Sequence, residues 1–401
     1  MKAMHLFVVC IIVMFLGREQ RSNEYTIGAI YNLEGSQASL DSPSAKGAEL
    51  AVQIINAQGG IRGKKLKLIL EDGKSDPAVI KKVTEKLIKD DNVPVIIGFS
   101  DTDMVLASAP IAAEHEVIFI TSGATSPKLP EQVPTYLYLS CFGDNVQAAV
   151  VAEYAFSRLG LHSCFMLTDE NMDFTRLLSK YFIKRYSELG GEIIKESFFQ
   201  GGTNNVQDII NEIIVLDQQP AMLFVSAGPN DVGNIIKQIR MAGITQPICG
   251  GDSYDTPLLI KTAGEYADNI YFATHFMVKE YTDDVYFTSP PAGEQEDSDK
   301  TIMEFITAYK NTYGTLPSSS FAALGYDAVM LVAEIYKRAI RLNPDGLFST
   351  LSHIRDFPGV TGTISYNEDQ KIPQKGVTLI KISNREQIFL ESLVPSKIPA
   401  P

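Results

Sequence analysis

Two short polar segments each follow an apolar run that has the length of a buried strand. Residues 93–99 are apolar and lead into the turn 100–103, and residues 117–121 lead into the turn 122–125. Short apolar runs bounded by turn residues are typical of parallel strands. Both turns then lie beyond the carboxyl ends of their strands, at the edge where open α/β folds bind ligands. We expect their hydroxyls and backbone N–H groups to face one crevice.

Thr102 is the residue of the first turn that is best placed for binding a carboxylate. It stands at the start of a predicted helix over residues 103–115, where unpaired N–H groups accompany its hydroxyl. A plain helix N-cap is the alternative role, and the two roles are compatible. Asp103 is expected to serve the helix N-terminus. Asp101 would weaken a carboxylate site if its side chain faced that site.

An acidic residue much later in the chain supplies the complementary chemistry. Asp252 follows a predicted strand over residues 247–250, and its carboxylate can accept hydrogen bonds from an ammonium group. The same residue is also a fair N-cap for the short helix predicted around residues 257–262. The residues alone do not separate these two roles.

The overall composition limits the classes of protein to which the chain can belong. A length of 401 residues suggests two domains or one large domain. The content of 45% hydrophobic and 21% charged residues is typical of a soluble globular protein. The net charge of −13, with no basic cluster, argues against binding to nucleic acid or to an anionic membrane surface.

Cysteine and histidine patterns give no sign of a metal centre or of catalysis. Beyond the N-terminal segment the cysteines are Cys141, Cys164 and Cys249, an odd number, so at least one is free unless a partner chain supplies a mate. Three buried, unpaired cysteines are the favoured interpretation. The histidines are scattered, which argues against a zinc site. With no nucleophile triad, paired-carboxylate motif or cofactor loop, we predict neither an enzyme nor a cofactor.

The first 22 residues have the pattern of a secretory signal. Lys2 supplies a positive end, and residues 6–16 form an apolar core that is shorter than the about 20 residues needed to span a bilayer. An uncleaved membrane anchor is the alternative. No Ala-x-Ala sequence marks a cleavage site. Either way, the mature chain is expected in the periplasm.

The order of predicted elements indicates two lobes of similar plan. Strands and helices alternate with short loops over residues 25–142, and the alternation starts again at residue 162. This pattern predicts an α/β fold with two Rossmann-like lobes, each on a parallel sheet. Residues 278–300 are predicted to form a surface loop, and the last eight residues a loose tail.

Ordered segments along the chain resemble one known family. They are GAELAVQIINAQGGIRGKKLKLILEDGKSDP (47–77), VIIGFSDT (95–102), ITSGATSPKL (120–129), CFGDNVQ (141–147), IIKQIRMAGI (235–244), GGDSYDTPLLIKTAG (250–264), FAALGYDAV (321–329) and FPGVTGTISYNED (357–369). Together they look like the type I solute-binding proteins of branched-chain amino acid (Leu/Ile/Val) ABC transporters.

The resemblance implies a domain plan with three crossovers between two closing lobes. They are expected near residues 142–143, 271–274 and 354–358. The implied units are a signal peptide at 1–22, an N-terminal lobe at 23–142 plus 275–352, a C-terminal lobe at 143–274 plus 353–393, and a tail at 394–401. Ligand binding would close the lobes about the crossovers.

The resemblance also implies roles for particular residues. Thr102, the backbone of Gly123 and the hydroxyl of Thr125 would hold a ligand carboxylate, and Asp252 would receive the ammonium. Phe174 stands where the family often has a tyrosine that covers the ligand. Further implied wall residues are Leu40, Tyr254 and Phe321. Fewer phenolic hydroxyls than the family pattern make the pocket more apolar, which puts leucine, isoleucine and valine specificity in doubt.

The function implied by the resemblance is that of a monomeric receptor that passes an amino acid-like solute to a membrane ABC permease. A ligand-sensing module for a chemoreceptor or sensor kinase is the alternative, because it would share the pocket and differ in its partner. A transcriptional repressor of the same two-lobed fold would need an N-terminal DNA-binding helix pair, and a signal-like segment stands there instead. The sequence does not name the solute.

Overall fold

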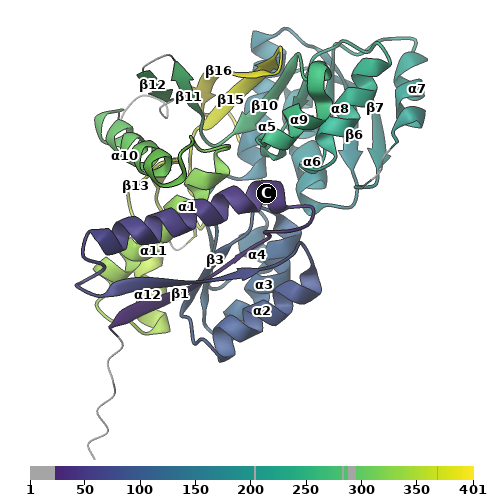
Figure 1. The fold of residues 1–401 in the computed structure, drawn as a ribbon. Helices are drawn as coiled ribbons and strands as arrows, with labels where there is room; N and C mark the ends of the chain where they lie inside the picture. Colours follow the sequence, from purple (N-terminus) through teal and green to yellow (C-terminus); the bar gives the residue numbers. More distant parts are fainter. Residues whose placement is uncertain (1–22, 203–204, 282–283, 288–294, 368) are drawn as a thin grey trace, which may run out of the picture.

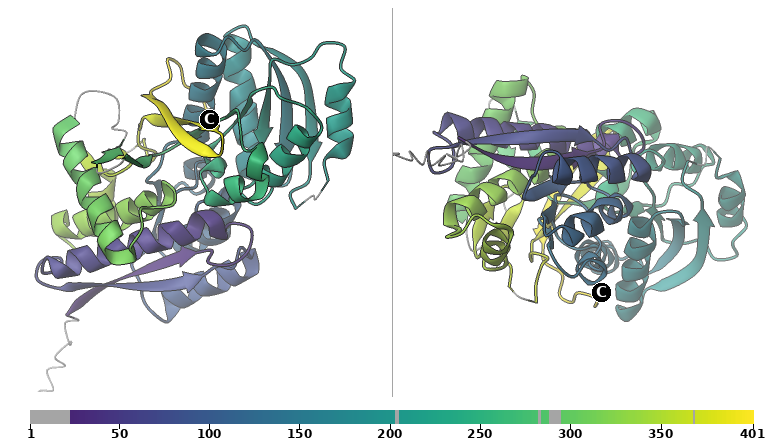
Figure 2. Two further views of the ribbon diagram at one scale, coloured as in Figure 1. Left: turned by 45° about the horizontal axis from the view of Figure 1, so that its top comes forward. Right: turned by 90° about the horizontal axis from the view of Figure 1, so that it is seen from below.

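The computed structural model describes residues 23–202, 205–281, 284–287, 295–367 and 369–401. Two α/β lobes are joined by several passages of the chain, as Figures 1 and 2 show. We call the lobe that contains the first strand the N-lobe and the other the C-lobe. This architecture confirms the predicted fold class. The predicted signal at 1–22 lies outside the described residues.

The N-lobe is built on a five-stranded parallel sheet in the order β2-β1-β3-β4-β5. The apolar runs predicted as strands are buried in it. Its strands are β1 (Glu24–Tyr31), β2 (Lys65–Asp72), β3 (Val95–Gly98), β4 (Ile118–Thr121) and β5 (Leu137–Leu139). Its helices are α1 (Ala38–Ala57), α2 (Pro77–Lys89), α3 (Thr102–Glu114), α4 (Leu129–Gln132), α10 (Gln295–Tyr313), α11 (Phe321–Arg338) and α12 (Pro344–Ser352).

Helices α1 and α11 approach each other so closely that glycine is required on both. A Cβ atom on Gly47 would lie 1.8 Å from the carbonyl oxygen of Ala322, and one on Gly325 would lie 1.9 Å from that of Ser44. No side chain fits at such distances. The close packing fixes the start of α11, and with it Phe321, beside the second polar turn.

The C-lobe is built on a seven-stranded sheet in the order β16-β15-β10-β9-β8-β6-β7, in which β15 and β16 run antiparallel to their neighbours. Its strands are β6 (Ser163–Asp169), β7 (Glu192–Phe199), β8 (Met222–Ser226), β9 (Ile248–Gly250), β10 (Ile270–Thr274), β15 (Val377–Ser383) and β16 (Glu386–Leu393). Its helical segments are α5 (Asp144–Glu153), η1 (Tyr154–Arg158), α6 (Asp173–Glu188), α7 (Gln207–Ile214), α8 (Val232–Met241), η2 (Asp252–Tyr254), α9 (Pro257–Ala263) and η3 (Gly264–Tyr266).

The third crossover lies later in the chain than we predicted. The hairpin of β13 (Phe357–Gly359) and β14 (Gly362–Ile364) packs in the N-lobe core. The Tyr366 hydroxyl donates to the Leu139 carbonyl at 2.7 Å, and the Leu139 N–H donates to the Lys371 carbonyl at 3.0 Å. These apolar and backbone contacts keep the chain on the N-lobe beyond residues 354–358, so the crossover falls after Lys371 and before β15.

The predicted surface loop at 278–300 is partly regular. It contains the antiparallel strands β11 (Val278–Tyr281) and β12 (Asp284–Phe287), and α10 begins within it. In the part of the chain that the structure describes, no helix is both long and apolar enough to cross a membrane. Cys141, Cys164 and Cys249 are buried and unpaired, which confirms the interpretation favoured above.

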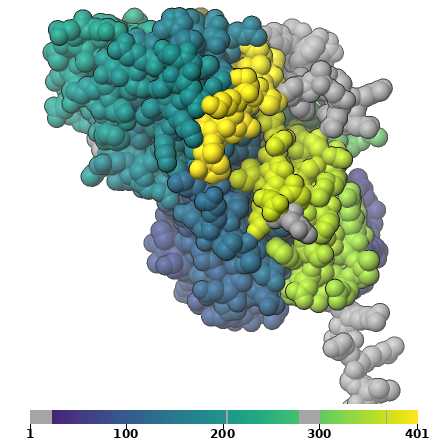
Figure 3. Space-filling view, turned by 180° about the vertical axis from the view of Figure 1, so that it is seen from behind, coloured from purple at the N-terminus to yellow at the C-terminus, as the bar shows by residue number. Residues whose placement is uncertain are grey.

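The predicted loose tail is bound to the C-lobe. Figure 3 shows the C-terminal segment lying along the boundary between the lobes. The N–H and hydroxyl of Ser396 donate to the Glu153 carboxylate at 2.9 and 2.7 Å. The same carboxylate lies 2.7 Å from the Arg185 guanidinium, and the Asn145 amide donates to the Pro399 carbonyl at 2.8 Å. These polar partners on α5 and α6 hold the tail, while its Val394 and Ile398 side chains stay exposed.

Replacing Glu153 by glutamine is expected to lower the free energy of unfolding by about 1–3 kcal/mol. The uncharged amide loses the ion pair with the largely buried Arg185 and cannot accept all the bonds from Ser396. Urea denaturation measures the change. A loss below about 0.5 kcal/mol, the usual size for a surface substitution, would show that the Glu153 contacts with Arg185 and the tail contribute little to stability.

Candidate ligand-binding cleft

The first polar turn presents a buried hydroxyl that no protein group binds. Asp101, and not Thr102, is the N-cap of α3, because its side chain accepts from the N–H of Met104 at 3.2 Å. The Thr102 side chain is 1% exposed, and its Oγ1 has no hydrogen-bond partner among the residues that the structure describes. Since buried hydroxyls are normally paired, Thr102 is suited to binding a ligand.

The second polar turn is engaged within the protein. The N–H of Gly123 donates to the carbonyl of Phe99 at 3.0 Å, and the Thr125 hydroxyl donates to Oδ1 of Asp144 at 2.6 Å. A Cβ atom on Gly123 would lie 3.0 Å from the Phe321 ring. The glycine therefore makes room for that ring. The structure brings both turns to one edge, and within the described residues the first turn keeps two buried hydroxyls without a hydrogen-bond partner, those of Ser100 and Thr102.

Asp252 is held in place by Gln147 and His275, which were not among the predicted site residues. Gln147 donates from Nε2 to Oδ1 of Asp252 at 3.1 Å and accepts from its N–H at 3.0 Å. Nε2 of His275 lies 3.0 Å from Oδ2, and because a carboxylate only accepts, the ring nitrogen donates. Thr256 caps α9 through a bond from Leu258, which removes the N-cap interpretation of Asp252.

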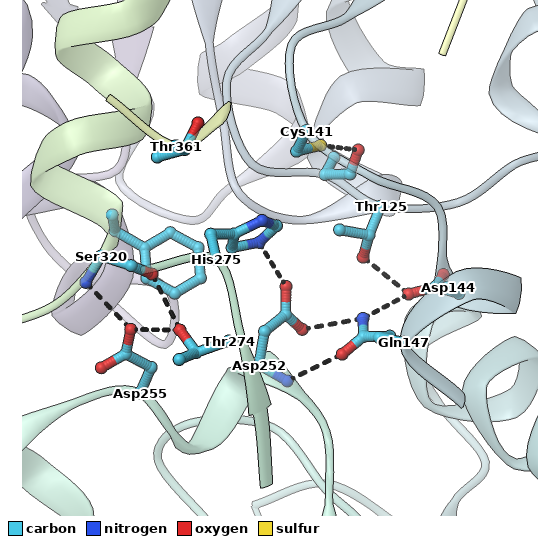
Figure 4. A network of polar contacts seen from close by, with 12 residues as sticks. Thr125, Cys141, Asp144, Gln147, Asp252, Asp255, Thr274, His275, Ser320 and Thr361 are labelled. Atoms are coloured by element: carbon cyan, nitrogen blue, oxygen red, sulfur yellow. Dashed lines mark hydrogen bonds and ion pairs between the residues drawn. The ribbon is translucent and has the colours of Figure 1, made fainter. Parts of the chain in front are cut away.

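These residues form one polar network between the lobes, which Figure 4 shows. Gln147 also donates to Asp144 at 3.0 Å, and so links Asp252 to the second polar turn. The ring of His275 stacks on Phe142 with centroids 3.9 Å apart. Both residues could have been identified from the sequence. Gln147 belongs to a segment that resembles the family, and His275 directly follows the end of β10.

A second group of contacts ties β10 to the start of α11. The Thr274 hydroxyl donates to Oδ2 of Asp255 at 2.6 Å, and the Ser320 N–H donates to the same oxygen at 2.9 Å. On the other side of the cleft, the N–H of Asp173 in α6 donates to Oδ2 of Asp103 in α3 at 3.2 Å. The lobes therefore touch across the cleft, and Asp103 meets the opposite lobe as well as standing at its own helix N-terminus.

The four predicted wall residues occupy different places. Leu40 and Phe321 are buried together in the N-lobe core beside the first turn. Phe174 is 7% exposed and lies at the start of α6, next to the contact between the lobes. Tyr254 packs inside the C-lobe, and its hydroxyl donates to the carbonyl of Val225 at 2.6 Å. We therefore leave Tyr254 out of the proposed ligand contacts and keep the other three as predictions.

Burial strongly perturbs the carboxyl groups around the cleft. Burial, with the nearby charges of Asp103 and Asp41, raises the pKa of the Asp101 carboxyl to about 7. Burial and the charges of Asp252 and Asp101 raise the pKa of Asp144 to about 8. Carboxyls from the N-lobe, the C-lobe and the first crossover are therefore close enough to raise one another's pKa.

Two wound lobes with polar groups meeting at their crossovers place the chain in the class of two-lobed α/β proteins. The family model described as periplasmic binding protein matches residues 24–387, and the chain belongs to this family. The family consists of solute-binding proteins and not of enzymes, as the sequence predicted.

Individual relatives are distant in sequence and close in fold. Leu/Ile/Val-binding protein homolog 1 of Brucella abortus (strain 2308) is 25% identical over 350 residues, covering 86% of this chain and 88% of that protein. The branched-chain amino acid transporter substrate-binding protein LivJ of Streptococcus pneumoniae, solved with isoleucine, has a TM-score of 0.82 at 29% identity, over 93% of this chain and all of that one. A solute-binding protein of Rhodopseudomonas palustris BisB5, solved with 3,4-dihydroxybenzoic acid, has a TM-score of 0.77 at 23% identity, over 94% and 99% of the two chains.

Proposed function

We propose that this protein captures a free amino acid or an amino acid-like molecule outside the cytoplasm and delivers it, as a monomer, to a membrane ABC permease. The observation that carries the proposal is the pairing of an unpartnered Thr102 hydroxyl on the N-lobe with a preset Asp252 carboxylate at the facing edge of the C-lobe. The first suits a ligand carboxylate and the second suits an ammonium. The amino acid-binding relatives support the same class of ligand and partner.

A ligand with an amino group fits the oriented Asp252 carboxylate better than a carboxylic acid without one. An aromatic acid brings a carboxylate and no cation, so Asp252 would repel it in a poorly solvated site. An ammonium group would instead make a charge-assisted hydrogen bond with a carboxylate that Gln147 and His275 already orient. We therefore favour an amino acid over the aromatic acid bound by the Rhodopseudomonas relative.

Mass spectrometry of the small molecule that co-purifies with the protein tests the proposal. The expected result is an amino acid or a close analogue that raises thermal stability when added back, by about 2.7 kcal/mol at a hundred times its dissociation constant. A library of amino acids and analogues that gives no stabilisation would overturn the proposal. Capture of a chemoreceptor or sensor kinase in place of a permease would assign the sensing role instead.

Replacing Thr102 by valine is expected to weaken binding about tenfold or more, because the ligand loses a hydrogen bond to a charged group. Folding stability should stay within about 0.5 kcal/mol, since the hydroxyl has no protein partner. Thr125→Val is the matched comparison, and there the loss of the bond to Asp144 should appear as lower stability. Calorimetric titration and thermal melts separate the two outcomes. Unchanged affinity in Thr102→Val would remove Thr102 from the site.

A further inference from the structure

The cleft holds more buried carboxylates than a neutral amino acid can satisfy. Besides Asp252, the acidic side chains at most 3% exposed there are those of Asp41, Asp101, Asp144 and Asp169. Asp101 stands at the start of α3, and Asp169 ends β6 in the opposite lobe. Asp103 and Asp173, which join the two lobes, add two half-buried carboxylates.

Several of these carboxylates have an oxygen without any protein partner. Among the described residues, one oxygen each of Asp41, Asp101, Asp144 and Asp169 is buried and accepts no hydrogen bond. The other oxygen of Asp41 accepts from Asn32, and that of Asp101 accepts from the N–H of Met104. The other oxygen of Asp144 accepts from Thr125 and Gln147, and that of Asp169 accepts from the N–H groups of Asn171 and Gly201. The side chains are therefore held in place while one acceptor on each remains available.

The basic groups nearest to these carboxylates are already committed or lie outside. Arg176 pairs with Asp173 and donates to the carbonyl of Glu170. The Nε2 atom of His275 serves Asp252. Lys46 and Lys261 are exposed and line a hollow between α1 and α9 that none of these carboxylates lines. The strongest charges acting on Asp101 are two other carboxylates, those of Asp103 and Asp41.

We propose that the ligand carries a second positive charge, as a basic amino acid of the lysine or arginine type does, and that Asp101 binds this charge. The inference rests on the proposed function, because it names the ligand class of the same cleft. The α-ammonium lies at Asp252 and the α-carboxylate at Thr102. The side-chain cation neutralises Asp101, which sits one residue from Thr102, and supplies the hydrogen-bond donor that its free oxygen lacks.

A neutral branched side chain would leave Asp101 unpaired in the closed cleft. Burying a carboxylate without a partner is unfavourable, and binding of such a ligand is weakened accordingly. A long side chain that ends in an ammonium or guanidinium group packs its methylene groups on apolar surface and directs its charge at the carboxylate. The cleft of this protein thus discriminates by charge between ligands that share the amino acid group.

Lysine and norleucine provide the test, because they differ only by the terminal ammonium. Calorimetric titration of the full-length mature protein, stripped of bound ligand, is expected to give about tenfold or more tighter binding of lysine than of norleucine. Asp101→Asn keeps the N-cap of α3 and removes the charge. The variant is expected to lose most of the preference for lysine, because it no longer attracts the side-chain cation and no longer leaves a charge unpaired beside norleucine. Asp217→Asn, on an exposed loop, is the matched control and should bind as the native protein does.

The outcomes separate the inference from the proposed function. Equal binding of lysine and norleucine, or tighter binding of norleucine or leucine, overturns the inference and leaves the amino acid receptor standing. A folded protein that binds none of these amino acids overturns both. The comparison of the two ligands on the native protein decides the inference even if Asp101→Asn folds poorly. A preference for lysine that persists fully in a well-folded Asp101→Asn removes the role of Asp101.

Discussion

Asp252→Ala is expected to weaken binding of an amino-bearing ligand by about 2–5 kcal/mol, or roughly thirtyfold to several thousandfold. The carboxylate is 3% exposed, so little water shields its attraction for an ammonium group. The substitution also leaves Gln147 and His275 without their acceptor, which should cost about 1–3 kcal/mol of folding stability. Calorimetric titration with the co-purified ligand measures the first effect, and urea denaturation the second.

The conservative variant Asp252→Asn separates charge from shape. It retains an acceptor for Gln147 or His275 and loses the negative charge, so binding should fall strongly while folding suffers less. Asp217→Ala controls for the removal of an exposed aspartate. Native affinity in a folded Asp252→Asn would show that the ligand has no ammonium at this position, and the proposed orientation would then be wrong.

The unliganded protein is expected to lose stability as the pH rises from about 4 to about 7. Asp101 has its pKa raised from 3.8 to about 7, so over this range the folded state keeps a proton that the unfolded chain has lost. The free energy of unfolding falls with rising pH wherever the unfolded state binds fewer protons than the folded state. At about 1.4 kcal/mol per unit of pKa, Asp101 alone accounts for roughly 4 kcal/mol as an upper limit. Asp41, raised to about 6, and Asp144, raised to about 8, act in the same direction.

Asp101→Asn isolates this effect. Near pH 5 the native aspartate is protonated in the folded state, so the variant and the native protein should differ little in stability. At pH 8 the variant should be more stable by about 1–4 kcal/mol, because it has no charge to bury. Urea denaturation at the two pH values makes the comparison. The same stability difference at both values would contradict the raised pKa and the picture of a buried, unpaired carboxyl.

The sequence pattern predicted the parts of the fold that depend on local hydrophobic order. Short apolar runs such as 93–99 became buried parallel strands, and the turns behind them met at one edge. The third crossover was misplaced because Phe357 and Ile364 complete the N-lobe core, which the local pattern cannot show. Ordering of the tail was missed for a similar reason, since Glu153 lies 243 residues away from Ser396.

The sequence predicted several residues of the candidate site but only some of the contacts that these residues make. Thr102 and Asp252 came from the sequence, but the partners of Asp252 did not, because the bond from Gln147 joins residues 105 positions apart. Gly123 and Thr125 lie at the predicted edge, yet their donors are used by Phe99 and Asp144. Which donors remain for a ligand depends on sheet register and side-chain packing. Those features arise only when the chain is folded.

A crystal structure of the protein with its co-purified ligand tests the central claim most directly. We expect one molecule between the lobes, with its carboxylate within hydrogen-bond distance of Thr102 Oγ1 and its amino nitrogen within hydrogen-bond distance of the Asp252 carboxylate. A ligand without an amino group, or one bound without contact to both residues, would contradict the account.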